Sequence, residues 1–415
     1  MENLLRMNSK RIIHDALETV LPDAAVIRAL QNHEFSSGRI RLLAVGKAAW
    51  QMAKAANDVL GKRIETGLVL TKYGHGKGPI ANYKIMEAGH PVPDENTIRG
   101  TEQAVELTCG LTAEDTVLFL LSGGGSALFE LPIIPLGELK ALTESLLSSG
   151  ADINEINTVR KRVSSVKGGR FALHCAPAKV FSIILSDVLG DEVSQIASGP
   201  TVLDTSTQEE ALAILKKYHL DSGRVLSCVS SADTPRSLDN AESVVIGSVR
   251  QLCAAAADTC TKLGYKTYIL TDRLTCEARE AGAFLAAVAQ SHWDTKIPLA
   301  FIAGGETVVH VTGNGLGGRN QELALAAASG LDGLAGCALF SIGSDGTDGP
   351  TDAAGGYVDG NTAAALRENG LNIYEVLRRN DAYHALDKIG GLIKTGSTGT
   401  NVNDVTVLLI NSLGR

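Results

Sequence analysis

Two stretches decide the fold: RLLAVGKAAWQMAKAANDVL at residues 41–60 and DTVLFLLSGGGSALFELP at residues 115–132. Each begins with a short apolar run that hardly alternates, which is typical of a strand buried on both faces. Each run then ends at a glycine turn, and the first continues as an alanine-rich amphipathic stretch that favours a helix. The pattern predicts strands that lead into tight turns, in the first case followed by a helix.

The same pattern recurs through the first half of the chain. The expected elements are a helix to about residue 30, strands at 67–72 and 83–89, a helix at 96–110, and a strand followed by a polar loop within 178–191. Apolar strands separated by helices indicate a parallel sheet that is covered by helices on both faces. We therefore expect an α/β fold here.

The segment SSADTPRSLDNAE, residues 230–242, is the most linker-like part of the sequence, because it is polar and contains proline. A domain boundary within it predicts domains at 1–236 and 237–415. Strand and helix patterns then alternate again, so the second domain is also expected to be α/β. Its expected elements are a strand and a helix within 243–265, strands at 266–272, 297–307, 308–313, 337–346 and 404–410, and helices at 276–290, 321–331 and within 362–386.

Composition and charge exclude several classes of protein. Glycine supplies 44 of the 415 residues, more than the roughly 7% of an average protein, so the surplus needs an explanation. Lys and Arg number 38 and Asp and Glu 46, and the net charge of −8 argues against a nucleic-acid partner. The chain shows neither a long apolar run nor a signal peptide, and its seven cysteines lack a CxxC pair, so we expect a soluble cytoplasmic protein without a zinc cage.

Ligands of open α/β sheets bind at the carboxyl ends of the strands, so the loops after the predicted strands are the candidate sites. Residues 122–126, SGGGS, form the clearest anion cradle, because glycines leave backbone N–H groups unshielded and the serines add hydroxyls. A flexible turn is the alternative interpretation. Lys47 follows a strand and opens a helix, a place where an anion would offset its charge, although a surface lysine would fit as well.

A glycine motif in the second half resembles a dinucleotide fingerprint, with G-x-G-x-x-G at Gly313, Gly315 and Gly318. The strand candidate before it alternates, unlike the first strand of a dinucleotide fold. Arg319 follows the glycines, where the fingerprint requires a small apolar residue. We interpret Arg319 as a fork for phosphate or carboxylate, with a cofactor loop as the alternative.

Carboxylates in these loops have the chemistry of magnesium ligands, although aspartates in glycine-rich loops also serve as turn residues. They are Asp187, Asp191, Asp345, Asp348 and Asp352. The basic residues of segment 160–167 are either a solvated helix face or part of an anion-binding cleft. The histidines are expected to be structural, and the P-loop, protein-kinase and α/β-hydrolase motifs do not occur.

These loops, taken in order, resemble those of the MOFRL-type glycerate 2-kinases, some of which are named hydroxypyruvate reductases. The resemblance runs from about residue 8 to residue 410. It is carried by VGKAA (45–49), HPVPDENT (90–97), LSGGGSALFELP (121–132), INTVRKRVSSVKGGR (156–170), ILSDVLGDE (184–192), IASGPTVLD (196–204), AGGETVVHVTGNGLGGRNQELALA (303–326), GSDGTDGPTDAAGG (343–356) and TGSTGTNVNDV (395–405).

The resemblance implies an N-terminal Rossmann-like domain, a C-terminal MOFRL domain and an active site in the cleft between them. It implies that ATP phosphorylates the C2 hydroxyl of D-glycerate, with Mg²⁺ as cofactor, to give 2-phosphoglycerate and ADP. Phosphoryl transfer needs mainly positioning and charge neutralisation, which agrees with the anion-cradling loops. Neither a nucleic acid nor a membrane is expected as a partner, and a homodimer is compatible with the sequence.

The resemblance also implies roles for single residues. Lys47 and Arg319 would stabilise the transferred phosphoryl group or bind the glycerate carboxylate. Asp187 would act as a magnesium ligand or as the base toward the C2 hydroxyl, and Glu306 would support the site or bridge the metal. The substrate- and phosphate-binding residues would be Ser122, Gly123, Gly124, Gly125, Ser126, Glu306 and Asn320.

Two other functions compete with this one. The glycine fingerprint suggests an NAD(P)H-dependent hydroxypyruvate reductase, but such an enzyme needs a proton donor, typically a histidine near an acid and an arginine, and the sequence does not indicate that set. A non-catalytic protein that binds a sugar acid or phosphosugar is the second alternative. The carboxylates beside the basic loops favour an enzyme over such a sensor.

Overall fold

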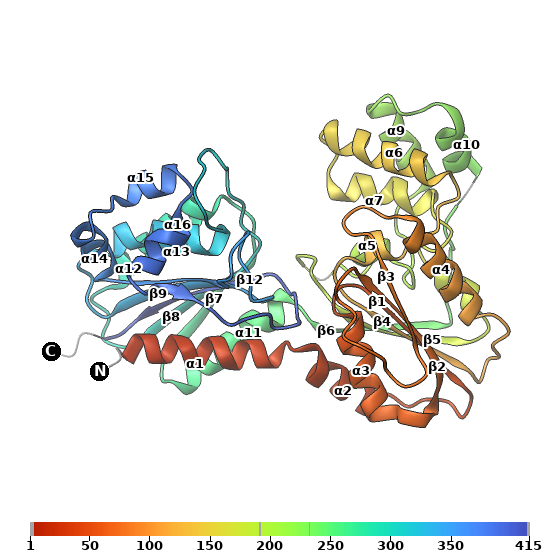
Figure 1. The fold of residues 1–415 in the computed structure, drawn as a ribbon, viewed down its shortest axis with the longest axis horizontal. Helices are drawn as coiled ribbons and strands as arrows, with labels where there is room; N and C mark the ends of the chain where they lie inside the picture. Colours follow the sequence, from red (N-terminus) through yellow and green to blue (C-terminus); the bar gives the residue numbers. More distant parts are fainter. Residues whose placement is uncertain (1–3, 191, 232, 413–415) are drawn as a thin grey trace. The chain divides into compact units, whose positions relative to one another are not determined.

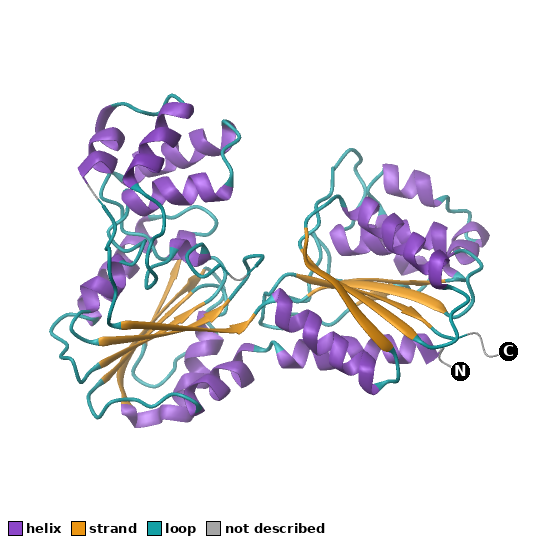
Figure 2. Ribbon diagram, turned by 180° about the vertical axis from the view of Figure 1, so that it is seen from behind, coloured by secondary structure: helices purple, strands orange, loops and turns teal. Residues whose placement is uncertain are grey.

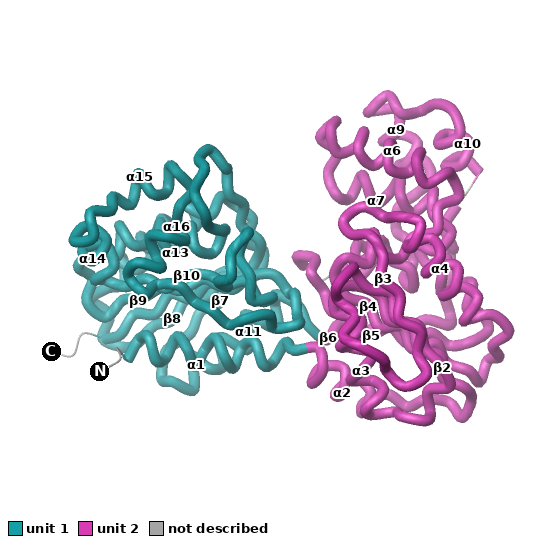
Figure 3. The backbone as a smooth tube through the Cα atoms, in the orientation of Figure 1, with its two compact units in different colours: residues 1–21, 247–415 teal, residues 22–246 magenta. Residues whose placement is uncertain are grey.

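The computed structural model describes most of the chain, namely residues 4–190, 192–231 and 233–412 (Figure 1). The chain forms two compact units, which are residues 22–246 and residues 1–21 with 247–415 (Figure 3). These units differ from the predicted domains at both ends of the first one. The expected N-terminal helix is two helices, α1 (Leu4–Thr19) and α2 (Pro22–Gln31), and only α2 belongs to the first unit.

The predicted parallel sheet forms in the unit of residues 22–246. Its strand order is β3-β2-β1-β4-β5-β6, and the pairs from β3 to β5 are parallel. The strands are β1 (Ile40–Val45), β2 (Ile64–Lys72), β3 (Lys84–Ala88), β4 (Thr116–Leu121), β5 (Lys179–Leu185) and β6 (Ala241–Gly247). The end of the predicted linker is therefore strand β6. The strand order reverses between β1 and β4, which is where doubly wound sheets bind ligands.

Helices cover both faces of this sheet, as expected (Figure 2). Leu43 and Val45 of β1 pack in one core with Ala104, while the alternate residues Leu42 and Ala44 are equally buried beneath the other face. A separate helical layer has its own apolar core. The helices of the unit after α2 are α3 (Ala49–Leu60), η1 (Gly61–Arg63), α4 (Glu95–Leu107), α5 (Gly125–Leu128), α8 (Arg170–Cys175) and η2 (Ile196–Ser198), and the separate layer contains α6 (Leu136–Ser148), α7 (Ile153–Arg162), α9 (Gln208–Lys217) and α10 (Gly223–Ser231).

The second unit holds a mixed sheet in the order β11-β10-β9-β12-β8-β7. Only β7 and β8 pair in parallel, and the other pairs are antiparallel. The strands are β7 (Lys266–Leu274), β8 (Leu299–Gly305), β9 (Cys337–Gly343), β10 (Gly355–Asp359), β11 (Leu392–Ile393) and β12 (Asp404–Ile410). The strand predicted at 308–313 is wrong, because that segment is a loop with a single bridge from Val308 to Glu277.

Helices α1 and α11 lie on one face of the mixed sheet, and the remaining helices lie on the other (Figure 1). Those elements are α11 (Val249–Lys262), α12 (Ala278–His292), α13 (Arg319–Leu331), α14 (Thr362–Glu368), α15 (Ile373–Arg378) and α16 (Ala382–Lys388). The predicted α/β class of this region is confirmed. Among the described residues, no helix has the length and apolar character that crossing a bilayer requires.

Candidate functional site

The loops after β1 and β4 are bonded to each other at the point where the strand order reverses. The backbone N–H of Lys47 donates to the carbonyl of Gly123 at 2.9 Å, and that of Ala48 donates to Oγ of Ser122 at 3.0 Å. Gly46 has a φ of 119°, and a Cβ there would lie 2.3 Å from the same hydroxyl. Only glycine allows this approach. The structure thus brings Lys47 and residues 122–126 together.

The glycines of the loop are surrounded by side chains that can do chemistry. A Cβ on Gly123 would lie 2.2 Å from Oδ2 of Asp187, which follows β5. A Cβ on Gly124 would lie 2.9 Å from the ring of His90 and 3.4 Å from Cγ of Lys47. The missing side chains therefore allow a carboxylate, an imidazole and a lysine to lie against one short loop.

A cavity of about 340 Å³ lies beside this loop and includes all five residues of SGGGS and Asp187 in its wall. Sequence reasoning missed its other polar residues, which include Asn157, Glu192 and Gln195. Nδ2 of Asn157 donates to Oε1 of Gln195 at 2.7 Å, and its Oδ1 accepts from Oγ of Ser198 at 2.8 Å. These residues lie far from the loop in sequence. Asn157 and Glu192 stand in motifs that carry the family resemblance, which was the signal that could have found them, whereas Gln195 lies between two such motifs.

His90 is the second feature that sequence reasoning missed, since the histidines were expected to be structural. Burial and, to a lesser extent, the positive charges of Lys47, Lys72 and His75 lower the pKa of His90 to about 4. The ring is therefore neutral at pH 7. Nδ1 of His75 lies 3.1 Å from the carbonyl of Lys47. The carboxyl ends of β1 and β2 thus carry a concentration of basic groups, which favours an anion.

The basic segment 160–167 is mostly buried, so its interpretation as a solvated helix face is wrong. Lys161 and Arg162 are buried and pair with Asp204 at 2.9 and 3.4 Å. Arg160 and Lys167 pair with the buried carboxylate of Glu130 at 3.4 and 3.6 Å. The charges of this segment are therefore compensated within the fold.

Lys167 supports the glycine loop from behind. Its Nζ donates to the carbonyls of Ser126, Phe129 and Ala197 at 3.1, 3.0 and 3.2 Å. Burial lowers the pKa of Lys167 to about 8, although Glu130 opposes this effect. Two of these carbonyls belong to residues that line the cavity, so Lys167 fixes part of its wall.

The other candidate residues lie in the second unit, around Arg319 at the start of α13. Its guanidinium binds Asp404 through Nε at 2.6 Å and Nη2 at 3.0 Å, and binds Glu306 through Nη1 at 2.8 Å. Burial raises the pKa of Asp404, against the effect of Arg319. The predicted fork for an anion is thus held in place by two carboxylates of the chain itself.

Asp348 explains the glycine fingerprint. Its carboxylate accepts from the backbone N–H groups of Asn320 at 3.1 Å and Gln321 at 2.9 Å, so it caps α13 where a dinucleotide would place its pyrophosphate. A Cβ on Gly318 would lie 2.3 Å from Cγ of Asp348. Burial raises the pKa of this carboxyl to about 6. The fingerprint is therefore a packing motif, and the cofactor interpretation of these glycines is wrong.

The remaining candidates have structural contacts. The side-chain oxygen of Asn320 accepts from Ser341 at 2.5 Å. Asp345 accepts from Thr347 in a turn, and Asp352 pairs with Lys394 on the surface. Asp191 lies outside the described residues.

No group of three or more metal-ligating side chains occurs among the described residues. Magnesium bound to a nucleotide needs only one or two carboxylates, because phosphate oxygens and water complete its shell. Asp187 fits that requirement, since its carboxylate lies in the cavity wall against Gly123. Glu306 is about half exposed beside Arg319. The expected metal bridge and the expected cleft between domains stay predictions.

Comparison with known proteins identifies relatives over nearly the whole chain. Family models match residues 8–230 (Domain of unknown function, DUF4147) and residues 299–404 (MOFRL family). The D-glycerate 2-kinase of Thermotoga maritima is 53% identical over 405 residues, which cover 96% of this chain and 97% of the relative. The glycerate 2-kinase of Pyrococcus horikoshii is 41% identical over 431 residues, which cover 97% and 96%.

A solved structure gives the same result. The crystal structure of the glycerate kinase from Thermotoga maritima matches with a TM-score of 0.94 at 53% identity, covering 98% of this chain and 99% of that one. The chain carries both family domains in the order DUF4147 then MOFRL. It therefore belongs to the MOFRL-type glycerate 2-kinase family.

Proposed function

We propose that the protein is a glycerate 2-kinase, which transfers the γ-phosphoryl group of ATP to the C2 hydroxyl of D-glycerate. One observation carries the proposal: Lys47 and Asp187 both lie against the SGGGS loop at the carboxyl ends of β1, β4 and β5, and the loop and Asp187 line one cavity. This arrangement favours phosphate binding, because lysine and backbone N–H groups attract phosphate oxygens. The carboxylate can serve as a base or as a metal ligand in phosphoryl transfer. The activity named for the relatives supports the same reaction.

In this proposal each residue of the site has a separate role in phosphoryl transfer. N–H groups of the 122–126 loop hold phosphate oxygens, and Lys47 offsets the charge that develops as the phosphoryl group moves. Arg319 binds the glycerate carboxylate, held in orientation by Asp404 and Glu306. Asp187 accepts the proton of the C2 hydroxyl. Magnesium, when bound, would neutralise phosphate charge. Glu306 would hold it, or Asp187 would do so in place of its role as the base.

The reaction is tested by phosphorus NMR of a mixture of protein, ATP, magnesium and D-glycerate. The proposal predicts a new resonance that coincides with added authentic 2-phosphoglycerate, with ADP formed in equal amount. A resonance of 3-phosphoglycerate would contradict the C2 assignment. Oxidation of NAD(P)H with hydroxypyruvate, without ADP formation, would establish the reductase instead. Saturable binding of a phosphosugar without turnover would establish the sensor.

The role of Asp187 is tested with Asp187→Asn, which removes the charge and keeps the shape. If Asp187 is the base, Asp187→Asn should lower kcat by about 10²-fold or more. The affinity of this variant for Mn²⁺ in the presence of ATP, measured by electron paramagnetic resonance, should be unchanged. A variant with normal kcat excludes the base. A weakened Mn²⁺ affinity assigns Asp187 to the metal instead.

Two further predictions belong to this proposal, a cytoplasmic location and a homodimer. The homodimer is tested by sedimentation velocity, in which a monomer mass at all concentrations would contradict it.

A further inference from the structure

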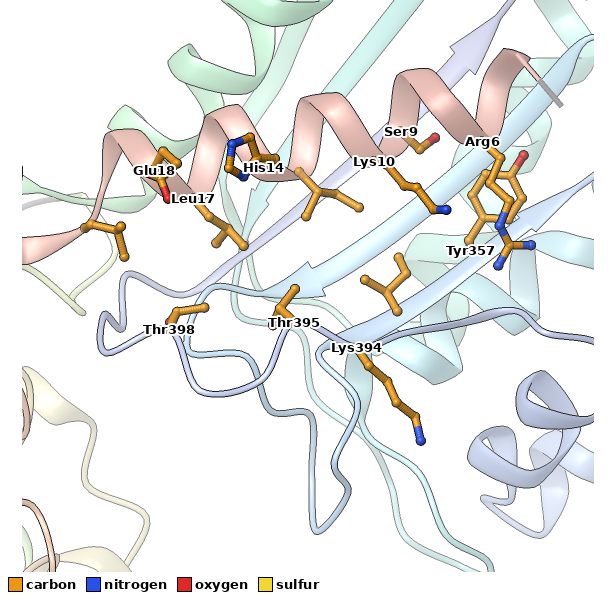
Figure 4. Close-up of a pocket in the computed structure, with 13 residues that line it drawn as sticks. Arg6, Ser9, Lys10, His14, Leu17, Glu18, Tyr357, Lys394, Thr395 and Thr398 are labelled. Carbon is orange, nitrogen blue, oxygen red and sulfur yellow. The ribbon is translucent and has the colours of Figure 1, made fainter. Parts of the chain in front are cut away.

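Two cavities of the molecule differ in how a buried polar side chain of the wall is used. In the cavity of about 530 Å³ beside α1 (Figure 4), the hydroxyl of Ser9 donates to the carbonyl of Leu5, one turn earlier in the same helix, at 2.8 Å. In the cavity beside the glycine loop, Asn157 of α7 bonds two residues of another segment. The contact of Ser9 stays within one helix, whereas Asn157 fixes one part of a cavity wall relative to another.

Asn157 binds both ends of one turn, residues 195–198. Its Nδ2 donates to Oε1 of Gln195 at 2.7 Å, and its Oδ1 accepts from Oγ of Ser198 at 2.8 Å. Asn157 and Ser198 are buried, so the bond between them is stronger than it would be in water. One side chain thus holds the turn at two points.

The turn needs such support because its backbone is left-handed at two residues other than glycine. The φ angle is 51° at Ala197 and 60° at Ser198. This conformation is unfavourable for residues with a Cβ and persists where the surrounding structure holds it. Asn157 holds the turn through Ser198, and Nζ of Lys167 holds it through the carbonyl of Ala197 at 3.2 Å. The shape of the turn therefore depends on contacts outside it.

The turn lies directly against the glycine loop. A Cβ on Gly125 would lie 2.8 Å from Cβ of Ala197, so the methyl group of Ala197 takes the space of a side chain at Gly125. Both residues line the cavity. A turn that relaxes from its left-handed conformation moves this methyl group, and the loop then loses its support on that side.

Helix α7 gives Asn157 a fixed position. The helix begins with a capping box, and its residues Ile156 and Val159 belong to the apolar core of the helical layer. Arg160 lies three residues after Asn157, and hence on the same side of the helix, and it donates to the carbonyl of Ser126 at 2.8 Å. One side of α7 therefore contacts both the turn and the glycine loop.

We propose that Asn157 is a positioning residue for phosphoryl transfer, which keeps the 122–126 loop in its phosphate-binding conformation by holding the turn 195–198 against Gly125. This role rests on the proposed function, in which N–H groups of that loop bind the phosphates of ATP. Loss of Asn157 should therefore weaken the binding of nucleotide. The binding of glycerate, which is assigned to Arg319, should not change.

Isothermal titration calorimetry of the full-length protein with the magnesium complex of a non-hydrolysable ATP analogue tests this role without turnover. Asn157→Ala and Ser198→Ala each break the bond between these two side chains, so each should weaken the affinity by about fivefold or more. The double variant should bind as Asn157→Ala does, because Asn157→Ala has already removed that bond. In steady-state assays, both single variants should raise the KM for ATP and leave the KM for glycerate unchanged.

Asn240→Ala is the matched control for stability. Nδ2 of Asn240 donates to the carbonyls of Ala172 and Ala178, both at 2.9 Å, so this variant also loses two hydrogen bonds in the same unit. Ala178 directly precedes β5, whereas the cavity lies at the other end of that strand. Asn240→Ala should therefore melt at a lower temperature and keep the wild-type affinity. Equal affinity of Asn157→Ala and Asn240→Ala would overturn the positioning role, and so would additive losses in the double variant.

The same titrations separate a failure of this role from a failure of the proposed function. Wild-type protein that binds the analogue and shows no phosphoryl transfer would contradict the proposed function, and the affinities of the variants would still decide the role of Asn157. Wild-type protein with no affinity for the analogue would overturn the positioning role, because the loop would then hold no phosphate for Asn157 to position.

Discussion

Two glycine-rich loops, residues 122–126 and 313–318, are similar in sequence and different in use. At Gly123 and Gly124, the space of a side chain is taken by Asp187, His90 and Lys47. At Gly313 and Gly315, it is taken by the main chain of residues 379–381, and at Gly318 by the capping carboxylate of Asp348. The first loop thus brings functional groups to a cavity, and the second packs one loop against another.

The function of a glycine-rich loop depends on which groups occupy the space that side chains would otherwise fill. The second loop precedes α13, whose first N–H groups attract an anion, and the first loop contains the start of the four-residue helix α5. In the second loop a carboxylate of the chain already takes that place, at 2.9 Å from the N–H of Gln321. In the first loop the nearby charges are those of Lys47, Lys72, Asp187 and Glu192. The predictions below test this difference.

The largest effect is expected from Lys167→Met, which removes the support behind the first loop. The free energy of unfolding should fall by about 3–5 kcal/mol, because Glu130 is left as a buried charge with fewer partners and three carbonyls lose a donor. Urea denaturation measures the change. Lys217→Met breaks the more exposed pair with Glu155 and should lower the free energy of unfolding far less than Lys167→Met does. Equal losses in the two variants would refute the supporting role.

Lys47→Ala and Arg319→Ala should each lower kcat/KM for glycerate by about 10²-fold or more, since each removes a charge from the proposed reaction. Only Arg319→Ala should also lower the melting temperature, because it strands the buried carboxylate of Asp404. Lys54→Ala, from an exposed pair on α3, is the matched control and should be normal in both assays. Near-normal kcat/KM in either variant would remove that residue from the mechanism.

Gly123→Ala and Gly315→Ala compare the two loops directly. In Gly123→Ala the new methyl group displaces only the end of the Asp187 side chain, so kcat/KM should fall about tenfold with little change in stability. In Gly315→Ala it meets the carbonyl of Arg379 at 2.5 Å, so stability should fall by about 1–3 kcal/mol. Steady-state kinetics and thermal melts of both variants measure these two effects. A loss of stability in Gly123→Ala together with a loss of kcat/KM in Gly315→Ala would show that the functions of the two loops have been exchanged.

A smaller effect is expected on the pH dependence of stability. His90 has a pKa of about 4 in the folded protein, below the ordinary 6.5, because it is buried among positive charges. Between these values the unfolded chain binds more protons, so this group lowers stability as the pH falls from 6.5 to 4. His90→Gln should lose this part of the pH dependence. Parallel stability curves for wild type and variant would contradict the pKa assigned to His90.

Much of the fold could be predicted from sequence, because the buried parallel strands are apolar on both faces and are followed by turn residues. Strand β10 was missed because it begins with Gly355 and Gly356, which favour loops. The strand at 308–313 was wrong because alternation alone does not establish a partner strand. The boundary of the first unit was misplaced because the polar linker pattern extends into β6.

The candidate site could be predicted in part. Lys47, the SGGGS loop and Asp187 follow from the rule that strand ends of a parallel sheet gather at one edge. His90 and Asn157 were not singled out, although both stand in motifs that carry the family resemblance, because only the folded chain brings them near the loop. The carboxylate partners of Arg319 could not be paired with it for the same reason, because Asp404 is 85 residues away.

The claim that the first loop holds phosphate is tested most directly by the pKa of His90, followed by NMR of the imidazole with and without a non-hydrolysable ATP analogue. The resonance is assigned by its loss in His90→Gln. A bound phosphate near Lys47 would offset the positive charges that now disfavour the imidazolium, so the pKa should rise from about 4 toward 6.5. A pKa that stays the same at saturating analogue would contradict the assignment of the 122–126 loop as the phosphate site.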